Sequence, residues 1–206
     1  MEKHEVIQIK KEETYEWLTK RHYAKRIPNI MFAFGLYKNN ILIGVITYGM
    51  PPSPSLCVGI CGIEYKNKVI ELNRLCLLEN HKNHASYLIS KSLKLLPQPS
   101  VVVSYADTSM NHIGYVYQAS NFIYSGLSAK RTDVDTGEKH ARHCENFDIS
   151  IRKNRPQKHR YIYFVANKKQ KKHLLQSLNY KILPYPKGNN LNYKTEYTPK
   201  TQGLLF

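Results

Sequence analysis

The chain has 206 residues, 42% of them hydrophobic, and a formal net charge of +16. This length is enough to bury one hydrophobic core, and no segment approaches the ~20 consecutive apolar residues that a membrane-spanning helix needs. The first 11 residues are of mixed charge and lack the apolar segment of a secretion signal, so we expect a cytoplasmic protein that is not bound to a membrane.

The positive charge is concentrated toward the C-terminus. Residues 151–206 contain 13 Lys and Arg against one Glu, whereas residues 1–150 contain 18 against 14 acidic residues. A surface that only has to stay soluble usually mixes the two signs. The one-sided excess in 151–206 therefore favours a polyanionic partner, above all nucleic acid.

The N-terminal part of the sequence predicts a strand, a helix and a hairpin. Alternating residues predict a strand at Glu5–Ile9, and helical periodicity follows at Glu12–Tyr23. Two β-rich segments, Phe32–Tyr37 and Ile41–Tyr48, flank the turn Lys38–Asn40. These elements predict that the chain enters a sheet early.

The middle of the sequence predicts a loop and then alternating strands and helices. Three prolines and two glycines make Met50–Gly62 a predicted loop. A strand is predicted at Val69–Leu77, an amphipathic helix at Ala85–Leu96 and a strand at Val101–Tyr105. A further helix is predicted at about 112–120.

The last elements complete a single domain over residues 1–206. We expect a strand at about 122–127, a polar loop over 130–149, a strand at His159–Ala166 and a helix at Lys168–Leu178 capped by Asn167. The tail, rich in Pro, Asn and Tyr, is predicted to be irregular. The order of elements predicts an α/β (α+β) fold with a mixed central sheet flanked by helices.

Three polar clusters stand where predicted strands or helices end, which is where open α/β sheets bind their ligands. They are Arg21–Tyr23, Glu71–Arg74 and Asp107 with the residues after it. Asp107 ends a hydrophobic strand, so its carboxylate is expected to face a crevice, although it could also cap a helix. His22 could equally be a surface histidine at a helix C-terminus.

Alternation along the predicted strand 69–77 puts Glu71 and Asn73 on one face and Leu72 and Arg74 on the other. An arginine inside an apolar strand needs a partner. Arg74 is therefore expected either to form a salt bridge with Asp107 or Glu71, or to contact a substrate.

The four cysteines are expected to be reduced, since nothing indicates secretion. Two of them and two histidines could be drawn as a zinc site: Cys57, Cys61, His81 and His84. Structural zinc sites usually have tighter paired spacing, and the alternative is that the thiols are small buried side chains.

The segment NHIGYVYQASNF, residues 111–122, resembles the late helix of GNAT acetyltransferases, usually N-x-x-A-x-x-L-Y-x-x-x-G-F. In that superfamily the tyrosine protonates the departing coenzyme A thiolate, which implies that Tyr117 is a general acid. A core tyrosine is the alternative. If Asp107 and Tyr117 serve one site, a continuous helix would hold them ~15 Å apart, so Thr108–Asn111 must be a loop and the helix must begin near His112.

The cofactor loop of those acetyltransferases has no counterpart here. They bind the pyrophosphate with a Gly-rich turn at a helix N-terminus, and the matching segment LLENHKNHAS contains no glycine. Side chains of residues 80–84 could hold a phosphate instead. The residues that would bind a cofactor are therefore not identified, and an acyl-CoA donor is in question.

Several blocks in the same order resemble the Mom family of bacteriophage DNA modification proteins, from about residue 15 to 188. They are KRHYAKRIPNIMFAFGLY, ELNRLCL, SYADTSMNHIGYVYQASNF, SGLSAKRT, KHRYIYF and PYPKG. The resemblance implies a GNAT-like fold. It also implies an enzyme that converts adenine in DNA to N6-carbamoylmethyl adenine, which shields phage DNA from host restriction.

The resemblance also implies site residues. Asp107, Tyr117, Arg74 and His22 are the catalytic candidates, and an iron site is implied at His22, Tyr23 and Asp107. Imidazole, phenolate and carboxylate groups suit iron. We expect Asp107 to accept the N6 proton, Arg74 to orient an oxygen of the donor, and Tyr117 to protonate the leaving group.

A basic surface is expected to bind the DNA. The predicted helix NKKQKKHLLQSL starts with four lysines, where cations oppose the helix dipole and repel one another, and phosphates would offset both effects. The candidate DNA-binding residues are Lys158, Arg160, Lys168, Lys169, Lys171 and Lys172. A homodimer along a duplex is compatible with this surface.

Two other functions remain open at this level. One is an acyl-CoA-dependent N-acetyltransferase that acts on another amine. The other is a DNA-binding module with a degenerate, inactive transferase fold, which needs only the basic surface.

Overall fold

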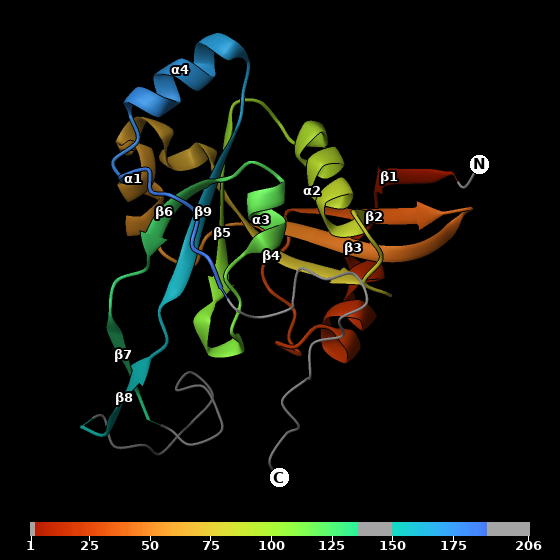
Figure 1. Cartoon of the computed structure of the whole chain (residues 1–206), viewed down its shortest axis with the longest axis horizontal. Coiled ribbons are helices and arrows are strands. Elements are labelled where there is room, and N and C mark those ends of the chain that lie inside the picture. Colours follow the sequence, from red (N-terminus) through yellow and green to blue (C-terminus); the bar gives the residue numbers. More distant parts are fainter. Residues whose placement is uncertain (1–2, 136–149, 189–206) are drawn as a thin grey trace.

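A computed structural model describes residues 3–135 and 150–188 of the chain (Figure 1). It contains a seven-stranded sheet in the order β1-β2-β3-β4-β5-β9-β6 and a two-stranded sheet of β7 and β8. The strands are β1 (His4–Gln8), β2 (Phe32–Lys38), β3 (Ile41–Gly49), β4 (Val69–Leu77), β5 (Ser100–Asp107), β6 (Ile123–Leu127), β7 (Arg131–Val134), β8 (Arg152–Arg155) and β9 (Lys158–Val165).

The large sheet is mixed, which confirms the predicted fold class. Its neighbouring strands run antiparallel except for β4 and β5, which are parallel and pair only through Val69–Glu71 and Val101–Val103. Beyond these residues the two central strands are no longer paired. A sheet that separates in the middle exposes backbone and side chains that a continuous sheet would cover, and this is where the cavity lies.

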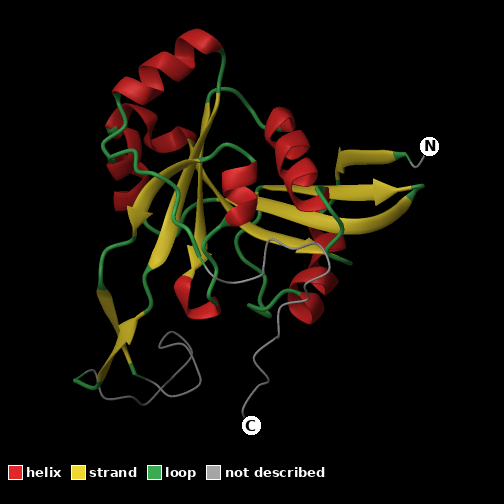
Figure 2. Cartoon of the chain, viewed as in Figure 1, coloured by secondary structure: helices red, strands yellow, loops and turns green. Residues whose placement is uncertain are grey.

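Helices cover both faces of the sheet (Figure 2). On one face α2 (His84–Leu95) packs Leu88, Ile89 and Leu93 into a core with Phe34 and Tyr48, and α3 (Tyr115–Ala119) lies beside it. On the other face α1 (Pro54–Cys61) and α4 (Lys168–Gln176) bury their apolar residues against β5 and β9. Each helix therefore contributes one apolar side to a core on its own face of the sheet.

The segment Met50–Gly62 is not the predicted loop, because it contains α1. Pro54 occupies the first turn of this helix, where the missing N–H has no partner to lose and the fixed φ suits the helix. Two of the three prolines lie before the helix begins, so they do not interrupt it. The proline-rich composition marks a helix start rather than a loop.

The predicted helix at Glu12–Tyr23 is helical but irregular. It consists of a 3-10 turn at Lys11–Thr14 and a π-helical turn at Trp17–Arg21, and it ends at His22, which has an extended conformation. Ending here frees the His22 and Tyr23 side chains from the helical repeat. The segment that follows, with Pro28, carries no regular element.

The polar stretch after residue 130 also differs from the prediction. Its start forms β7, which pairs with β8 to make a short ribbon, and residues 136–149 of the predicted loop lie outside the described residues. In the tail, residues 181–188 are irregular, as predicted, and the rest lies outside the description. Among the described residues no helix is long and apolar enough to cross a membrane.

Candidate active site

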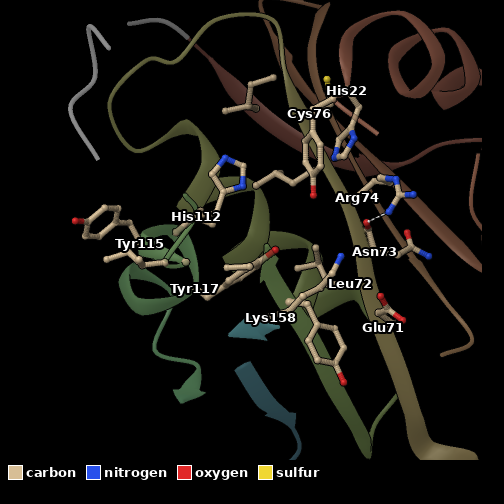
Figure 3. Close-up of a pocket in the computed structure, with 18 of the residues that line it drawn as sticks. His22, Glu71, Leu72, Asn73, Arg74, Cys76, His112, Tyr115, Tyr117 and Lys158 are labelled. Carbon is tan, nitrogen blue, oxygen red and sulfur yellow. Dashed lines mark hydrogen bonds between the residues drawn. The ribbon is translucent and has the colours of Figure 1, made fainter. Parts of the chain in front are cut away.

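A cavity of about 420 Å³ opens where β4 and β5 separate (Figure 3). Its walls come from the end of the first helical segment, from β4 and β5, from the segment that leads into α3, and from the first residue of β9. The polar and aromatic lining residues are Arg21, His22, Tyr23, Glu71, Asn73, Arg74, Asn80, Tyr105, His112, Tyr115, Tyr117 and Lys158. The predicted candidates His22, Tyr23, Arg74 and Tyr117 therefore meet in one place.

A β-bulge in β4 puts Arg74 on the opposite face from the one that alternation predicts. Thr47 pairs with Arg74 and Tyr48 with Leu72, so Asn73 is an extra residue between them. The bulge reverses the alternation, and Arg74 falls on the same face as Glu71. The Asn73 amide supports the bulge, because its Oδ1 accepts a 2.6 Å bond from Thr47 and its Nδ2 donates a 2.8 Å bond to the Asn29 carbonyl.

Arg74 is incompletely paired within the cavity. Its Nη1 donates a 2.6 Å bond to the Asn73 carbonyl, but its buried Nε has no hydrogen-bond partner among the described residues. Burial lowers the pKa of the guanidinium, and the positive charge of Arg26 lowers it further. A buried donor without a partner costs roughly 1–3 kcal/mol. The guanidinium also lines the cavity, where its remaining terminal N–H groups suit a ligand that brings an acceptor oxygen. The salt bridge with Asp107 or Glu71 does not form.

Glu71 is the carboxylate that lines the cavity. Burial raises its pKa, while the positive charges of Arg74 and Lys158 act in the opposite direction. Among the described residues none forms a hydrogen bond or ion pair with this carboxylate. Glu71 can therefore accept a proton or a hydrogen bond from a bound molecule.

His22 is a neutral, buried histidine in the cavity wall. It is only 8% exposed, and burial, followed by the positive charge of Arg74, lowers its pKa to about 4. Its Nδ1 accepts a 3.1 Å bond from the Ala24 N–H, which assigns the ring proton to Nε2. The ring stacks on Tyr23 at 4.5 Å, and Tyr23 meets His112 edge-on at 5.7 Å.

Tyr117 reaches the cavity because α3 starts late. After β5 the chain makes a 3-10 turn at Thr108–Met110, and Asn111 and Gly114 both have positive φ. The expected break after Asp107 is thus confirmed, and α3 begins at Tyr115, three residues after the predicted start. Gly114 is required here because a Cβ would lie 2.8 Å from Cζ of Tyr161.

The Tyr117 side chain is both packed and polar. Its ring contacts Phe122 and Tyr161, with centroids 5.5 and 5.2 Å away. Burial raises the pKa of the phenol to about 12 although Ser104 hydrogen-bonds to it, so the hydroxyl keeps its proton at neutral pH. Both interpretations of this residue, a core ring and a proton donor, are compatible with its environment.

Asp107 lies next to the cavity but does not line it. Its Oδ1 caps the following 3-10 turn, accepting from the Ser109 N–H at 3.0 Å and from the Ser109 hydroxyl at 2.7 Å. Its Oδ2 lies 2.7 Å from Nζ of Lys158. Burial acts to raise the pKa of Asp107, but hydrogen bonds from Lys158 and Ser109 prevail and lower it. The capping alternative is therefore what forms, and Lys158 presents its charge to the cavity.

The described residues do not fit the implied iron site. His22 has Nδ1 occupied and a proton on Nε2, and both oxygens of Asp107 are already bonded. No group of three or more His, Cys, Asp or Glu side chains that could hold a metal occurs in the described ranges 3–135 and 150–188. We derive no chemistry from iron at His22, Tyr23 and Asp107.

The zinc alternative joins residues of separate environments. Cys57 and Cys61 are buried in the core beneath α1, and burial raises the pKa of both thiols. His81 contacts Glu79 at 2.5 Å and packs against His84 at the start of α2. The cysteines are core side chains, as in the second interpretation.

The basic residues expected to form one surface are separated. Lys158 lines the cavity, whereas Arg160 is held by Ser125 at 2.8 Å and covers the Tyr180 ring at 3.4 Å. The lysines of α4 follow the other end of β9, about 23 Å from Lys158 at the usual rise of a strand. Figure 1 shows α4 and the β7–β8 ribbon at opposite ends of the sheet.

Sequence patterns do not single out two further residues of the cavity wall or the buried serine that bonds to Tyr117. Tyr105 and His112 line the wall, and Ser104 bonds to Tyr117 and donates a 2.9 Å bond to the Leu72 carbonyl. In the sequence, the position of His112 between Asp107 and Tyr117 is the feature that could have identified it as a cavity residue. Tyr105 and Ser104 read as ordinary strand residues. The separation of β4 from β5 brings Tyr105 to the cavity wall, whereas Ser104 stays fully buried.

Solved structures with a similar arrangement include acetyltransferases. A GNAT-family acetyltransferase from Bacillus cereus matches with a TM-score of 0.45 and 15% identity, covering 79% of this chain and 97% of the other. Arabidopsis thaliana NAA60 in complex with acetyl-CoA matches with a TM-score of 0.48 and 13% identity, covering 79% and 98%.

The sequence comparisons identify the family. The methylcarbamoylase mom of Escherichia phage Mu is 31% identical over 188 residues, which cover 81% of this chain and 77% of the relative. The model of the Mom protein family matches residues 3–187, nearly the whole described chain and every residue of the cavity wall. The chain therefore belongs to the Mom protein family.

Proposed function

We propose that this protein is a phage DNA-modifying transferase that converts adenine to N6-carbamoylmethyl adenine and so protects the DNA from host restriction. Its similarity to the methylcarbamoylase of phage Mu supports a role in modifying phage DNA. The observation that carries the chemistry is the Arg74 guanidinium, which lines the cavity and has only one hydrogen bond, from Nη1, among the described residues. A carbamoylmethyl group has a carbonyl oxygen that can accept from its remaining terminal N–H groups.

The walls of the cavity suit a flipped adenine. The exocyclic N6 is inaccessible to an active site while the base is stacked in a duplex, and enzymes of this kind bind the base outside the stack, between aromatic side chains. Tyr23, Tyr105, Tyr115 and Tyr117 line this cavity, and its volume lies within the range of small-molecule sites. The neutral His22 adds a hydrogen-bond donor.

We assign the proton transfers to Glu71 and Tyr117. As N6 forms its bond to the carbon of the transferred group, N6 loses a proton, and Glu71 is the cavity carboxylate with open lone pairs and a raised pKa. The bond from that carbon to the leaving group breaks, and the Tyr117 hydroxyl supplies its proton. Arg74 holds the carbonyl oxygen of the transferred group.

Asp107 acts through Lys158 in this scheme. Its two oxygens are committed to Ser109 and Lys158, so it is a weak candidate for the N6 proton. By fixing the ammonium group at the wall it places a positive charge near the reacting atoms. An acyl-CoA donor would be held by side chains such as Asn80, since no glycine turn precedes α2.

Mass spectrometry of nucleosides from the DNA of expressing cells tests the proposal. The expected result is a modified adenosine with the wild type, and none with Glu71→Gln or Tyr117→Phe. Glu64→Gln, at an exposed position of the 3-10 segment Ile63–Lys68, is the matched control and keeps the product. Unmodified DNA with a folded wild type rejects the proposal, and points to a DNA-binding module or to a transferase for another amine.

A further inference from the structure

The β7–β8 ribbon has no apolar core of its own. β7 and β8 pair antiparallel, and seven of their eight residues are exposed, the exception being the half-buried Val134. In Figure 1 the ribbon projects from the main sheet below β6 and β9. A two-stranded ribbon alone is marginally stable in water, so its side chains must be explained by something other than core packing.

The ribbon carries an excess of positive charge on one side. The residues of a cross-strand pair share a face, so Arg131 and Arg155, which are paired, lie on the same face as the pair Asp133 and Lys153. Like charges directly opposite each other are destabilising. Arg155 approaches Asp133 at 3.8 Å, but the Arg131 side chain forms no hydrogen bond or ion pair with any described residue.

The ribbon is joined to the cavity wall. β8 leads through Pro156 and Gln157 to Lys158, which lines the cavity. Ser128 fixes this junction, since its N–H donates to the Lys158 carbonyl at 2.8 Å and its hydroxyl accepts from the Lys158 N–H at 3.0 Å. Burial raises the pKa of Tyr105, another cavity residue, and the charge of Arg131 is among the smaller effects that act in the opposite direction.

We propose that the β7–β8 ribbon binds the phosphate backbone of duplex DNA next to the base in the cavity, chiefly through Arg131 and Arg155. This inference rests on the proposed function, and it adds a surface to the candidate DNA-binding residues. The positive face matches a phosphate backbone in charge, and two-stranded ribbons fit DNA grooves. A phosphate between Arg131 and Arg155 offsets the repulsion of the pair.

The test compares two double variants that each remove two positive charges. Arg131→Gln/Arg155→Gln changes the ribbon, and Lys66→Gln/Lys68→Gln changes exposed residues before β4, at its other end from the cavity. Fluorescence anisotropy with duplex DNA over a series of KCl concentrations measures affinity. We expect the ribbon variant to bind at least about tenfold more weakly, with the slope of log K against log salt reduced by ~2, and the control to bind like the wild type.

Two further measurements keep the test decisive. Circular dichroism checks folding, and Arg131→Lys/Arg155→Lys is expected to restore the salt slope because the charge is kept. An unchanged slope in the Gln variant, or equal losses in both double variants, overturns the inference. Because binding is measured without chemistry, a wild type that binds through the ribbon but yields no modified adenine refutes only the proposed function.

Discussion

The Asp107 carboxylate and the Lys158 ammonium lie 2.7 Å apart, at the last residue of β5 and the first residue of β9. The two residues are paired directly across these antiparallel strands, and they hold the edge of the cavity together. Asp107 is mostly buried, with 13% of its side chain exposed, whereas the side chain of Lys158 is 33% exposed and Lys158 lines the cavity. The same ion pair therefore stabilises the fold and fixes the positive charge of Lys158 at the cavity wall.

Replacing Asp107 with Asn should lower the free energy of unfolding by about 1–2 kcal/mol at neutral pH, because the charged bonds to Lys158 and Ser109 are lost. Since folding lowers the pKa of Asp107, this contribution is present above the ordinary value near 4 and is lost as pH falls through the lower folded value. Urea unfolding of both proteins across this range measures it.

Asp135→Asn is the matched control for that experiment. Asp135 forms an ion pair with Lys153 at 3.0 Å, but its side chain is 40% exposed. Exposed pairs contribute little, so the control should change stability by less than ~1 kcal/mol. An equal loss of stability in the two variants would show that the Asp107–Lys158 pair contributes no more to stability than an exposed ion pair.

His22 should make the protein less stable in mild acid. Its pKa is about 4 in the folded protein and about 6.5 when unfolded, so the unfolded state binds more protons between these values. Stability is therefore lost as pH falls from 6.5 to 4, by about 3 kcal/mol for a shift of this size. His22→Asn keeps an acceptor for the Ala24 N–H and should flatten the pH profile of urea unfolding.

The pH dependence of stability that remains in the His22→Asn variant reports on the other buried histidines. Burial also lowers the pKa of His112 and His159, so the His22→Asn variant should retain a smaller loss in the same range. A profile identical to that of the wild type would mean that His22 is not the neutral, buried group described above.

Much of the fold follows from local pattern, because strands and helices that pack one face against a core repeat their apolar residues regularly. The hairpin of β2 and β3, strand β4 and helix α2 lie within one or two residues of their predicted bounds. The Asn167 cap is also present, accepting a 2.9 Å bond from the Gln170 N–H.

The parts that could not be predicted depend on contacts between distant residues. The bulge at Asn73 is defined by its pairing with β3, so alternation along one strand puts Arg74 on the wrong face. Asp107 does not line the cavity, and its carboxylate is bonded to Lys158, which lies 51 positions further along the chain. Four residues that the family resemblance implies, His22, Tyr23, Arg74 and Tyr117, line one cavity, but only the structure shows that Asp107 is bonded to Lys158 and Ser109 and lies outside it.

Replacing Gly114 with Ala should destabilise the protein by about 2–4 kcal/mol and disturb the site. Its φ of +82° disfavours any side chain, and the added Cβ would overlap the Tyr161 ring. Gly62→Ala tests backbone strain without a clash, since nothing lies within 4 Å of the added Cβ, but its φ of +86° and ψ of 177° fall in a region essentially restricted to glycine, so it should still lose about 1–3 kcal/mol. Thermal unfolding measures both losses, and a loss below about 1 kcal/mol in Gly114→Ala would rule out the clash with Tyr161.

Three lysines of α4, Lys168, Lys169 and Lys172, should contribute to DNA binding only when the duplex is long. They follow the far end of β9, about 23 Å from Lys158, whereas a duplex of about ten base pairs centred on the cavity reaches only ~17 Å to each side. Lys171 is left out because its Nζ lies back over the Tyr163 ring, 5.7 Å from the centroid. Replacing the three with Gln should therefore leave affinity for such a duplex unchanged. It should weaken binding to one of about thirty base pairs and reduce the salt slope of that binding.

The ribbon variant provides the contrast for this prediction. Arg131→Gln/Arg155→Gln should weaken binding to both duplexes, because the ribbon adjoins the cavity, whereas the α4 variant should weaken binding only to the long one. Removing the three cations Lys168, Lys169 and Lys172 from the start of α4 should also stabilise the helix by a few tenths of a kcal/mol for each, so a loss of affinity cannot be attributed to unfolding. Equal affinity of the α4 variant and the wild type for the long duplex would mean that α4 presents a solvated basic face, and that DNA follows the ribbon alone.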